Sequence, residues 1–203
     1  MVERAEGPWA AQASADKAGF IFDFDGVLVD TMEAHFAAYG RALEEFGVPI
    51  DREQFYYQAG MKGIEQIAYF CKQAGCGDID PEVVYKRKGE LAPEFTHLIT
   101  PIPENIQLLH ALRAAGHPVA IASGSSKPSI LPASKRFGIE VDTVVSAEDV
   151  ERGKPHPDLF LEAARRLGRK PQDCVVIEDA PVGLEAALAA GMACHLFERP
   201  GKE

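Results

Sequence analysis

Eight residues with side chains or backbone groups suited to chemistry occupy related places in this sequence. Two pairs of acids each follow a short apolar run, a Ser-Gly-Ser segment follows a third run, and one lysine stands in a Gly-Lys-Pro segment. The residues are Asp23, Asp25, Ser123, Gly124, Ser125, Lys154, Glu178 and Asp179. Apolar runs that end in polar residues predict buried strands, and open parallel sheets bind ligands at the carboxyl ends of their strands. We therefore expect these groups to converge on one edge of a sheet.

The four acids indicate a metal site. Burying four carboxylates together is very costly without a cation, and donors that are all oxygen favour Mg²⁺ over zinc. Alternate side chains on a strand share a face but lie about 6–7 Å apart. This is too far for Asp23 and Asp25 both to bind one Mg²⁺ at about 2.1 Å. The simpler arrangement uses the Asp23 carboxylate and the Asp25 backbone carbonyl, with Glu178 and Asp179 as the other protein ligands.

The same groups suit phosphoryl transfer from a small phosphate monoester through an aspartyl-phosphate. A carboxylate nucleophile at Asp23 must approach an anionic phosphate, and Mg²⁺ and Lys154 would offset the repulsion. The Ser123 hydroxyl and the backbone N–H groups around Gly124 would hold the transferring oxygens. The Asp25 side chain, left out of the metal shell, would protonate the leaving alkoxide and then take a proton from the attacking water.

The rest of the pattern alternates strands and helices. Five apolar runs predict strands, and amphipathic segments between them, several followed by glycine, predict helices. This alternation indicates an α/β fold with a parallel sheet and helices on both faces. The expected strands are residues 19–25, 118–122, 141–145, 174–177 and 193–197, and the expected helices are residues 105–115, 130–137, 158–167 and 182–190.

Residues 32–98 interrupt this alternation and predict an all-helical cap domain inserted after the first strand. Such a cap would stand over the strand ends and act as a lid. We expect residues 18–31 and 99–203 to form the core domain and residues 1–17 to form a disordered tail. The expected cap helices are residues 32–46, 63–74 and 81–91, and the aromatic residues expected in the cap's own core are Phe36, Tyr39, Phe55, Tyr56 and Tyr57.

Composition restricts the function further. The formal net charge of −10, without a run of lysines or arginines, argues against nucleic-acid binding. No apolar stretch approaches the roughly 18 residues that suggest a membrane span. The first residues also lack the apolar segment of a secretory signal. The four cysteines form no CxxC pair, so we expect reduced thiols in a cytoplasmic protein. We expect a monomer or a weak homodimer.

Four blocks of sequence resemble the motifs of haloacid dehalogenase superfamily phosphatases, particularly the branch of β-phosphoglucomutase and fructose-1-phosphate-type phosphatases. FDFDGVLVDT (22–31) resembles the nucleophile motif and IASGSS (121–126) the phosphate-binding motif. GKPHPDLF (153–160) resembles the lysine motif, and VIEDAPVGLEAALAAGM (176–192) resembles the acidic metal motif. The resemblance implies a Rossmann-like core, a helical cap inserted after the first strand, Mg²⁺, and Asp23 as the nucleophile.

The resemblance also separates related activities. Dehalogenase members lack the second acid and phosphonate-cleaving members carry a small residue there, so Asp25 favours a phosphatase or a mutase. The mutase cap has an arginine a few residues past a loop glycine, whereas this sequence has a glycine in that place, within residues 60–63. A mutase must hold a bisphosphate during turnover. The missing arginine therefore favours a phosphatase, and a sugar phosphate is the expected substrate.

Three cap residues are candidates for binding the polar end of the substrate: His35, where the mutase also has a histidine, Lys62 and Lys88. His35 could equally be a packing or surface histidine, and both lysines could be solvated. Two other functions stay open. A phosphohexose mutase would use the same aspartyl-phosphate. A signalling receiver domain would also use an acidic pocket, Mg²⁺ and a lysine, but its nucleophile normally follows a later strand and no helical insertion is expected.

Overall fold

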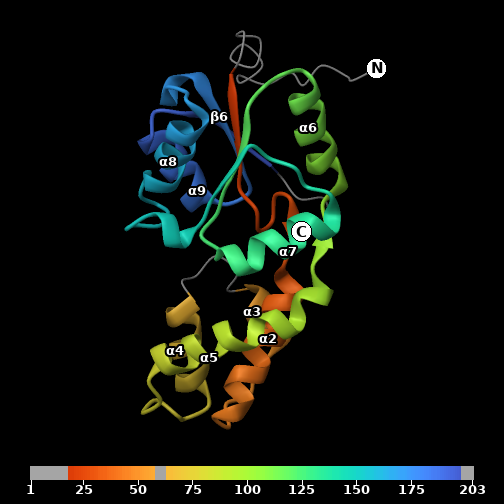
Figure 1. Cartoon of the computed structure of the whole chain (residues 1–203). Helices are drawn as coiled ribbons and strands as arrows, with labels where there is room; N and C mark the ends of the chain where they lie inside the picture. Colours follow the sequence, from red (N-terminus) through yellow and green to blue (C-terminus); the bar gives the residue numbers. More distant parts are fainter. Residues whose placement is uncertain (1–17, 58–62, 198–203) are drawn as a thin grey trace. The chain divides into compact units, whose positions relative to one another are not determined.

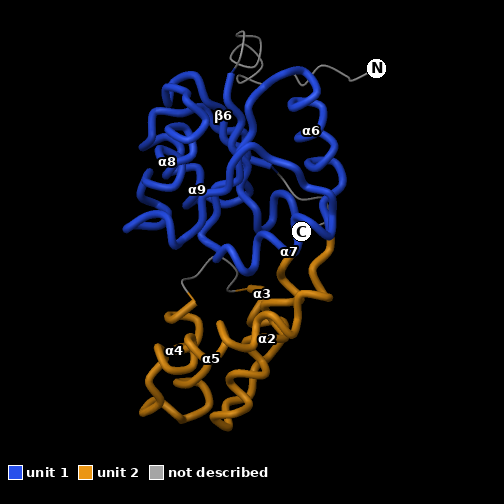
Figure 2. The backbone as a smooth tube through the Cα atoms, in the orientation of Figure 1, with its two compact units in different colours: residues 1–30, 101–203 blue, residues 31–100 orange. Residues whose placement is uncertain are grey.

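The computed structural model describes residues 18–57 and 63–197 (Figure 1). The chain divides into two compact units, residues 1–30 with 101–203 and residues 31–100 (Figure 2). We call the first the core unit and the second the helical unit. The limits predicted for the cap domain, residues 32 and 98, lie close to this division.

A five-stranded parallel sheet forms the centre of the core unit. Its strands are β1 (Gly19–Phe22), β4 (Val119–Ala122), β5 (Thr143–Val145), β6 (Cys174–Glu178) and β7 (Ala193–Leu196), in the order β5-β4-β1-β6-β7. Phe22 of β1 lies opposite Ile121 on one side and Ile177 on the other. All residues of β1, β4 and β6 are buried, as expected for parallel strands covered on both faces. The sheet confirms the predicted α/β fold class.

Four α-helices of the described residues flank this sheet. They are α6 (Pro103–Ala114), α7 (Lys127–Phe137), α8 (Asp158–Leu167) and α9 (Pro181–Ala189), with short 3₁₀ segments η2 (Ala147–Asp149) and η3 (Pro171–Asp173). Figure 1 shows α8 and α9 on one side of the sheet and α6 on the other. Phe160 of α8 and Ala186 of α9 belong to one buried cluster with Ile21 and Val176 of the strands. This packing fixes the strands whose ends carry the candidate site.

Glycines end two of these helices, as the sequence predicts. Gly138 after α7 and Gly168 after α8 adopt the left-handed conformation, each with a φ of 66°. Glycine is favoured there because it has no Cβ to crowd the neighbouring carbonyl group. All the strands and helices predicted for the core are present, and α8 has the predicted ends.

The described part of the helical unit is made of α2 (Met32–Glu45), α3 (Arg52–Tyr57), α4 (Gly63–Gln73), α5 (Pro81–Leu91) and the 3₁₀ segment η1 (Ala92–Leu98). Helix α3 was not predicted, because six residues are too few to display a helical period. Phe55, Ile67 and Phe70 pack in the buried core of this unit. The expectation that Tyr57 belongs to this core is wrong, since its side chain is 91% exposed.

The chain passes between the two units at two short strands, β2 (Val29–Asp30) and β3 (Thr100–Pro101), which pair with each other. The prediction that the helical unit covers the strand ends of the core stays a prediction. Among the helices that the structure describes, none is both long enough and apolar enough to cross a membrane.

Candidate active site

Asp23, Ser123 and Glu178 lie at the carboxyl ends of three adjacent strands, β1, β4 and β6. The Asp23 N–H donates to the Ile177 carbonyl over 2.9 Å, and the Ser123 N–H donates to the Val145 carbonyl over 3.0 Å. The hydrogen bonding of the sheet therefore continues one residue past β1 and past β4. Glu178 is the last residue of β6. The side chains of all three residues are buried, so the sheet holds them in place at its carboxyl edge.

Lys154 links two of these acids. Its Nζ donates to Asp23 Oδ1 over 2.7 Å and to Glu178 Oε1 over 2.6 Å. The lysine side chain is 12% exposed, and its Nζ also lies 5.2 Å from the centre of the Phe160 ring. The chain brings Lys154 to this place from the loop that precedes α8. The structure thus unites three residues that are far apart in the sequence.

Both oxygens of the Glu178 carboxylate accept hydrogen bonds from the protein. Its Oε1 accepts from Lys154, and its Oε2 accepts from the backbone N–H groups of Asp179 and Ala180 over 2.6 and 2.7 Å. These N–H groups lie at the start of α9, where the helix dipole favours negative charge. Glu178 is therefore held at both oxygens while it is only 1% exposed.

Asp25 is held by the serine loop after β4. Its Oδ2 accepts hydrogen bonds from Ser125 Oγ over 2.6 Å and from Ser123 Oγ over 3.2 Å. The Ser125 N–H donates to Ser123 Oγ over 3.0 Å, and Gly124 lies between the two serines. The predicted phosphate-binding loop and the predicted general acid therefore lie in direct contact.

Burial shapes the ionisation of Asp23 and Lys154. Burial raises the pKa of Asp23, Lys154 opposes that shift, and Glu178 and Asp25 add to it, which places the pKa at about 7. Burial lowers the pKa of Lys154, but the ion pairs with Asp23 and Glu178 outweigh burial and hold it above its ordinary value. Lys154 is therefore cationic, and one lysine does not balance the acids around it. A further cation would favour the ionised form of Asp23.

A cluster of three carboxylates could hold such a cation. Asp23, Glu178 and Asp179 each offer one oxygen, and these three oxygens lie within 4.8 Å of one another. The donor set is all oxygen, which is the chemistry that Mg²⁺ prefers. The residues present therefore fit a Mg²⁺ ion. The participation of the Asp25 backbone carbonyl stays a prediction.

Two of the three cap candidates meet in the helical unit. Lys88 Nζ lies 3.3 Å from His35 Nδ1 and 4.9 Å from the centre of the Tyr39 ring. Tyr39 is 6% exposed, in agreement with its predicted place in the core of this unit. Lys62, the third candidate, lies outside the described residues, as does most of the loop in which the mutase arginine is missing.

Asp149 was not predicted from the sequence, and its carboxylate is the centre of a group of hydrogen bonds and ion pairs. Its carboxylate accepts from Lys127 Nζ and from Arg166 Nη2, each over 2.8 Å, and also from the backbone N–H and hydroxyl of Ser146. These partners hold the pKa of Asp149 below its ordinary value, the Arg166 contact contributing most. Lys127 begins α7, directly after the serine loop. The signal was present as Ser-Ala-Glu-Asp, since Ser-x-x-acid is the pattern of a capping box.

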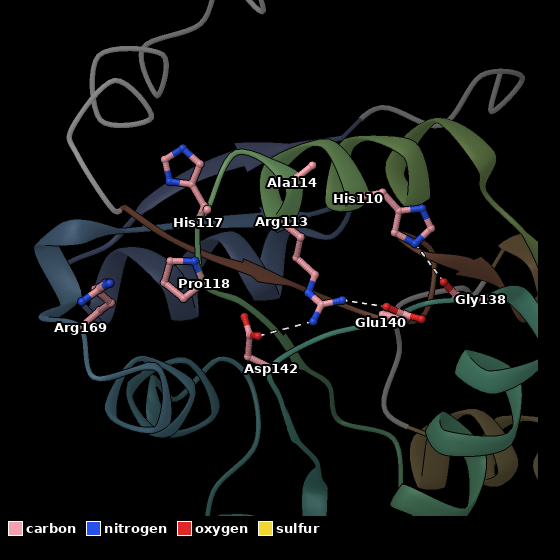
Figure 3. A pocket seen from close by; sticks show the side chains of 10 residues that line it. His110, Arg113, Ala114, His117, Pro118, Gly138, Glu140, Asp142 and Arg169 are labelled. Atoms are coloured by element: carbon pink, nitrogen blue, oxygen red, sulfur yellow. Dashed lines mark hydrogen bonds and ion pairs between the residues drawn. The ribbon is translucent and has the colours of Figure 1, made fainter.

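The opposite edge of the sheet carries a crevice of about 770 Å³ (Figure 3). Arg113 reaches between two acids there, 2.9 Å from Glu140 and 3.7 Å from Asp142. His110 Nε2 lies 2.9 Å from the Gly138 carbonyl oxygen. Arg113, Glu140 and Asp142 form ion pairs with one another, and the predicted site residues do not line the crevice. The carboxyl edge, with its unbalanced buried acids, is therefore the stronger candidate for chemistry.

The chain is similar to known proteins along almost its whole length. A sequence model of the family described as haloacid dehalogenase-like hydrolase matches residues 20–197. Hexitol phosphatase A from Escherichia coli (strain K12) is 38% identical over 180 residues, which cover 88% of this chain and 81% of that protein. Beta-phosphoglucomutase from Bacillus subtilis (strain 168) is 34% identical over 188 residues, covering 85% and 79%. The crystal structure of CbbY from Rhodobacter sphaeroides in complex with phosphate has a TM-score of 0.75 at 27% identity, covering 93% and 90%.

Proposed function

The chain belongs to the haloacid dehalogenase-like hydrolase family, and from this premise we propose that it is a Mg²⁺-dependent phosphatase. Its substrate would be a small phosphate monoester, a sugar or sugar-alcohol phosphate, hydrolysed through an aspartyl-phosphate on Asp23. The observation that carries the proposal is the buried contact of Asp23 with Lys154, beside Glu178 and the serine-bound Asp25.

The nucleophile in this proposal is a carboxylate oxygen of Asp23. It forms a bond to phosphorus while the bond from phosphorus to the leaving alkoxide breaks. The Asp25 carboxyl gives its proton to that alkoxide, which departs as an alcohol. Water then attacks the aspartyl-phosphate, Asp25 takes a proton from it, and inorganic phosphate leaves with Asp23 restored.

The other residues of the site would offset the negative charge of the phosphate and orient its oxygens. Lys154, already 2.7 Å from Asp23, offsets the negative charge of the phosphate as the carboxylate approaches it. The serine hydroxyl and backbone N–H groups at Ser123, Gly124 and Ser125 orient the transferring oxygens. Asp23, Glu178 and Asp179, with the Asp25 carbonyl, would hold Mg²⁺. When bound, this ion would neutralise charge on the phosphoryl oxygens.

Substrate choice would depend on the helical unit. We assign His35 and Lys88, which lie 3.3 Å apart, together with Lys62, to binding the polar part of the substrate. A hexitol phosphatase and a phosphoglucomutase are both among the relatives, so a mutase using the same aspartyl-phosphate is the second candidate. The glycine in place of the mutase arginine favours the phosphatase.

Release of inorganic phosphate from a panel of esters tests the proposal. The panel contains β-glucose-1-phosphate, fructose-1-phosphate, a hexitol phosphate and phosphoglycolate, each with Mg²⁺ or with EDTA. We expect release that requires Mg²⁺ and is lost in Asp23→Asn. Conversion of glucose-1-phosphate to glucose-6-phosphate without net release would identify a mutase. Release that persists in Asp23→Asn would exclude Asp23 as the nucleophile.

A further inference from the structure

Gly183 lies in the first turn of α9, next to the space that the Glu178 side chain occupies. A Cβ placed on Gly183 would lie 2.6 Å from Cγ of Glu178 and even closer to its Cδ and Oε1. Heavy atoms do not approach a Cβ this closely, so any side chain at position 183 would force Glu178 to move. We propose that Gly183 is a positioning residue, whose missing side chain lets the Glu178 carboxylate lie against Lys154 and the start of α9.

The Glu178 side chain cannot move aside without losing hydrogen bonds. The side chain is 1% exposed, and its two oxygens accept three hydrogen bonds, from Lys154 and from the N–H groups of Asp179 and Ala180. Its backbone is fixed as well, because Glu178 is paired with Leu196 in the sheet. A turn of the side chain would therefore break the contact with Lys154. It would also take one oxygen out of the group formed with Asp23 and Asp179.

The backbone of Gly183 does not itself require glycine. Seven glycines of the described residues have positive φ, and Gly183 is not one of them. It has an ordinary place inside a helix, where alanine is the better helix former. Helix propensity therefore predicts that Gly183→Ala stabilises the protein, whereas the contact with Glu178 predicts the opposite. Only the lack of space beside the residue explains a glycine here. The proposal can therefore be tested by whether Gly183→Ala stabilises or destabilises the protein.

The helical unit offers a matched control, which is also a glycine-to-alanine substitution inside a helix. Gly89 also lies inside a helix, α5, and a Cβ placed there would meet no atom within 4 Å. Gly89→Ala should raise the melting temperature through helix propensity alone. The comparison with Gly183→Ala therefore separates the effect of the backbone from the effect of the crowded space.

The first measurement is the melting temperature in EDTA of wild type, Gly183→Ala, Glu178→Ala and the double variant. We expect Gly183→Ala to lower the melting temperature of the wild type. In the Glu178→Ala background, where the crowding atoms are gone, the same substitution should raise it. A rise in both backgrounds, or a fall in both, would overturn the proposal. If Gly183→Ala does not fold, a folded double variant supports the proposal and an unfolded one contradicts it.

The second measurement concerns the site. Residues that orient metal ligands typically contribute 10–100-fold to metal affinity or activity. We expect Gly183→Ala to lower kcat/KM by that factor and to weaken Mg²⁺ binding in calorimetry without substrate. A folded Gly183→Ala with wild-type values of both would contradict a positioning role. The kinetic part rests on the proposed function, but the melting temperatures do not. A wild type that hydrolyses no ester would therefore refute the function and leave the inference about Gly183 to be decided by the melting temperatures.

Discussion

The two edges of the core sheet carry ion pairs of opposite character. At the carboxyl edge, Lys154 and Glu178 have side chains only 12% and 1% exposed. At the amino edge, Arg113 and Glu140 have side chains 35% and 76% exposed (Figure 3). Both edges lie on one sheet of one unit, and only the surroundings of the charges differ.

This difference in exposure distinguishes a candidate functional site from an ordinary protein surface. Exposed pairs lie in water, which screens them, and they typically contribute about 0–1 kcal/mol. At the carboxyl edge, Asp23 and Glu178 share one lysine in a buried place, and the pKa of Asp23 is raised to about 7. Perturbed ionisation of this kind, in a group with a specific charged partner, is typical of functional sites. Four variants test whether the contrast between the edges holds.

The largest effect is expected for Lys154→Met. The substitution keeps an apolar stem of similar length but removes the charge that lies 2.7 Å from Asp23. Loss of one preorganised electrostatic group typically lowers kcat by about 10²–10³-fold, and we expect a loss of that size. Steady-state phosphate release in Mg²⁺ measures it. Lys170→Met, at an exposed lysine of the same unit, serves as the control and should keep wild-type kcat. Equal losses in both variants would remove the special status of the carboxyl edge.

A smaller loss is expected for Ser125→Ala. The Ser125 hydroxyl lies 2.6 Å from Asp25 Oδ2, and a typical hydrogen bond contributes about 0.5–1.5 kcal/mol. We expect kcat to fall by about 2–10-fold, because Asp25 loses the contact that orients it. The same assay on Ser129→Ala provides a matched control, since the Ser129 hydroxyl contacts Ser126 rather than Asp25. An unchanged kcat for Ser125→Ala would mean that the serine loop does not orient Asp25.

Asp149→Asn should lower the free energy of unfolding at neutral pH, and the loss should fade at acid pH. Asp149 has a lowered pKa in the folded protein, so its ionised form favours folding. This contribution is complete above the ordinary pKa of about 4 and is lost as the pH falls through the lower, folded value. We expect the variant to lose about 1–3 kcal/mol of unfolding free energy at pH 7.

Urea unfolding of both proteins at several pH values measures this difference. The gap between wild type and Asp149→Asn should narrow steadily below pH 4. A gap that stays constant down to pH 2 would show that the charge of Asp149 is not what stabilises the fold.

The sequence predicted the sheet and the convergence of its polar ends because both follow from local patterns. Asp23 and Glu178 each end an apolar run, and parallel strands bring such ends together. The contact between Lys154 and Asp23 was harder to predict from the sequence. Lys154 contacts Asp23 across 131 residues, and the sequence placed the two only at the same edge. Neither the engagement of both Glu178 oxygens nor the need for glycine at position 183 leaves a periodic signal, because both depend on a single interatomic contact.

Other misses have a different origin. Asp149 was overlooked because its three partners come from separate segments, although the capping pattern that starts at Ser146 was visible. Tyr57 was assigned to a core by residue type, and type alone does not give the direction of a side chain on a short helix. Patterns therefore predict elements well, whereas the direction of individual side chains requires the folded chain.

The smallest effect is expected for Arg113→Met at the amino edge. The Arg113 side chain contacts Glu140, which is 76% exposed, and Asp142, which is 45% exposed. Water screens these pairs, so the variant should lose no more than about 1 kcal/mol of unfolding free energy and keep wild-type kcat/KM. Asp142 keeps its hydrogen bond from the Val119 N–H, so the start of β4 stays anchored. Urea unfolding and phosphate release measure the two quantities. A fall in kcat/KM of tenfold or more, with a normal unfolding midpoint, would show that the two edges are coupled, and the amino edge could then no longer be treated as a passive surface.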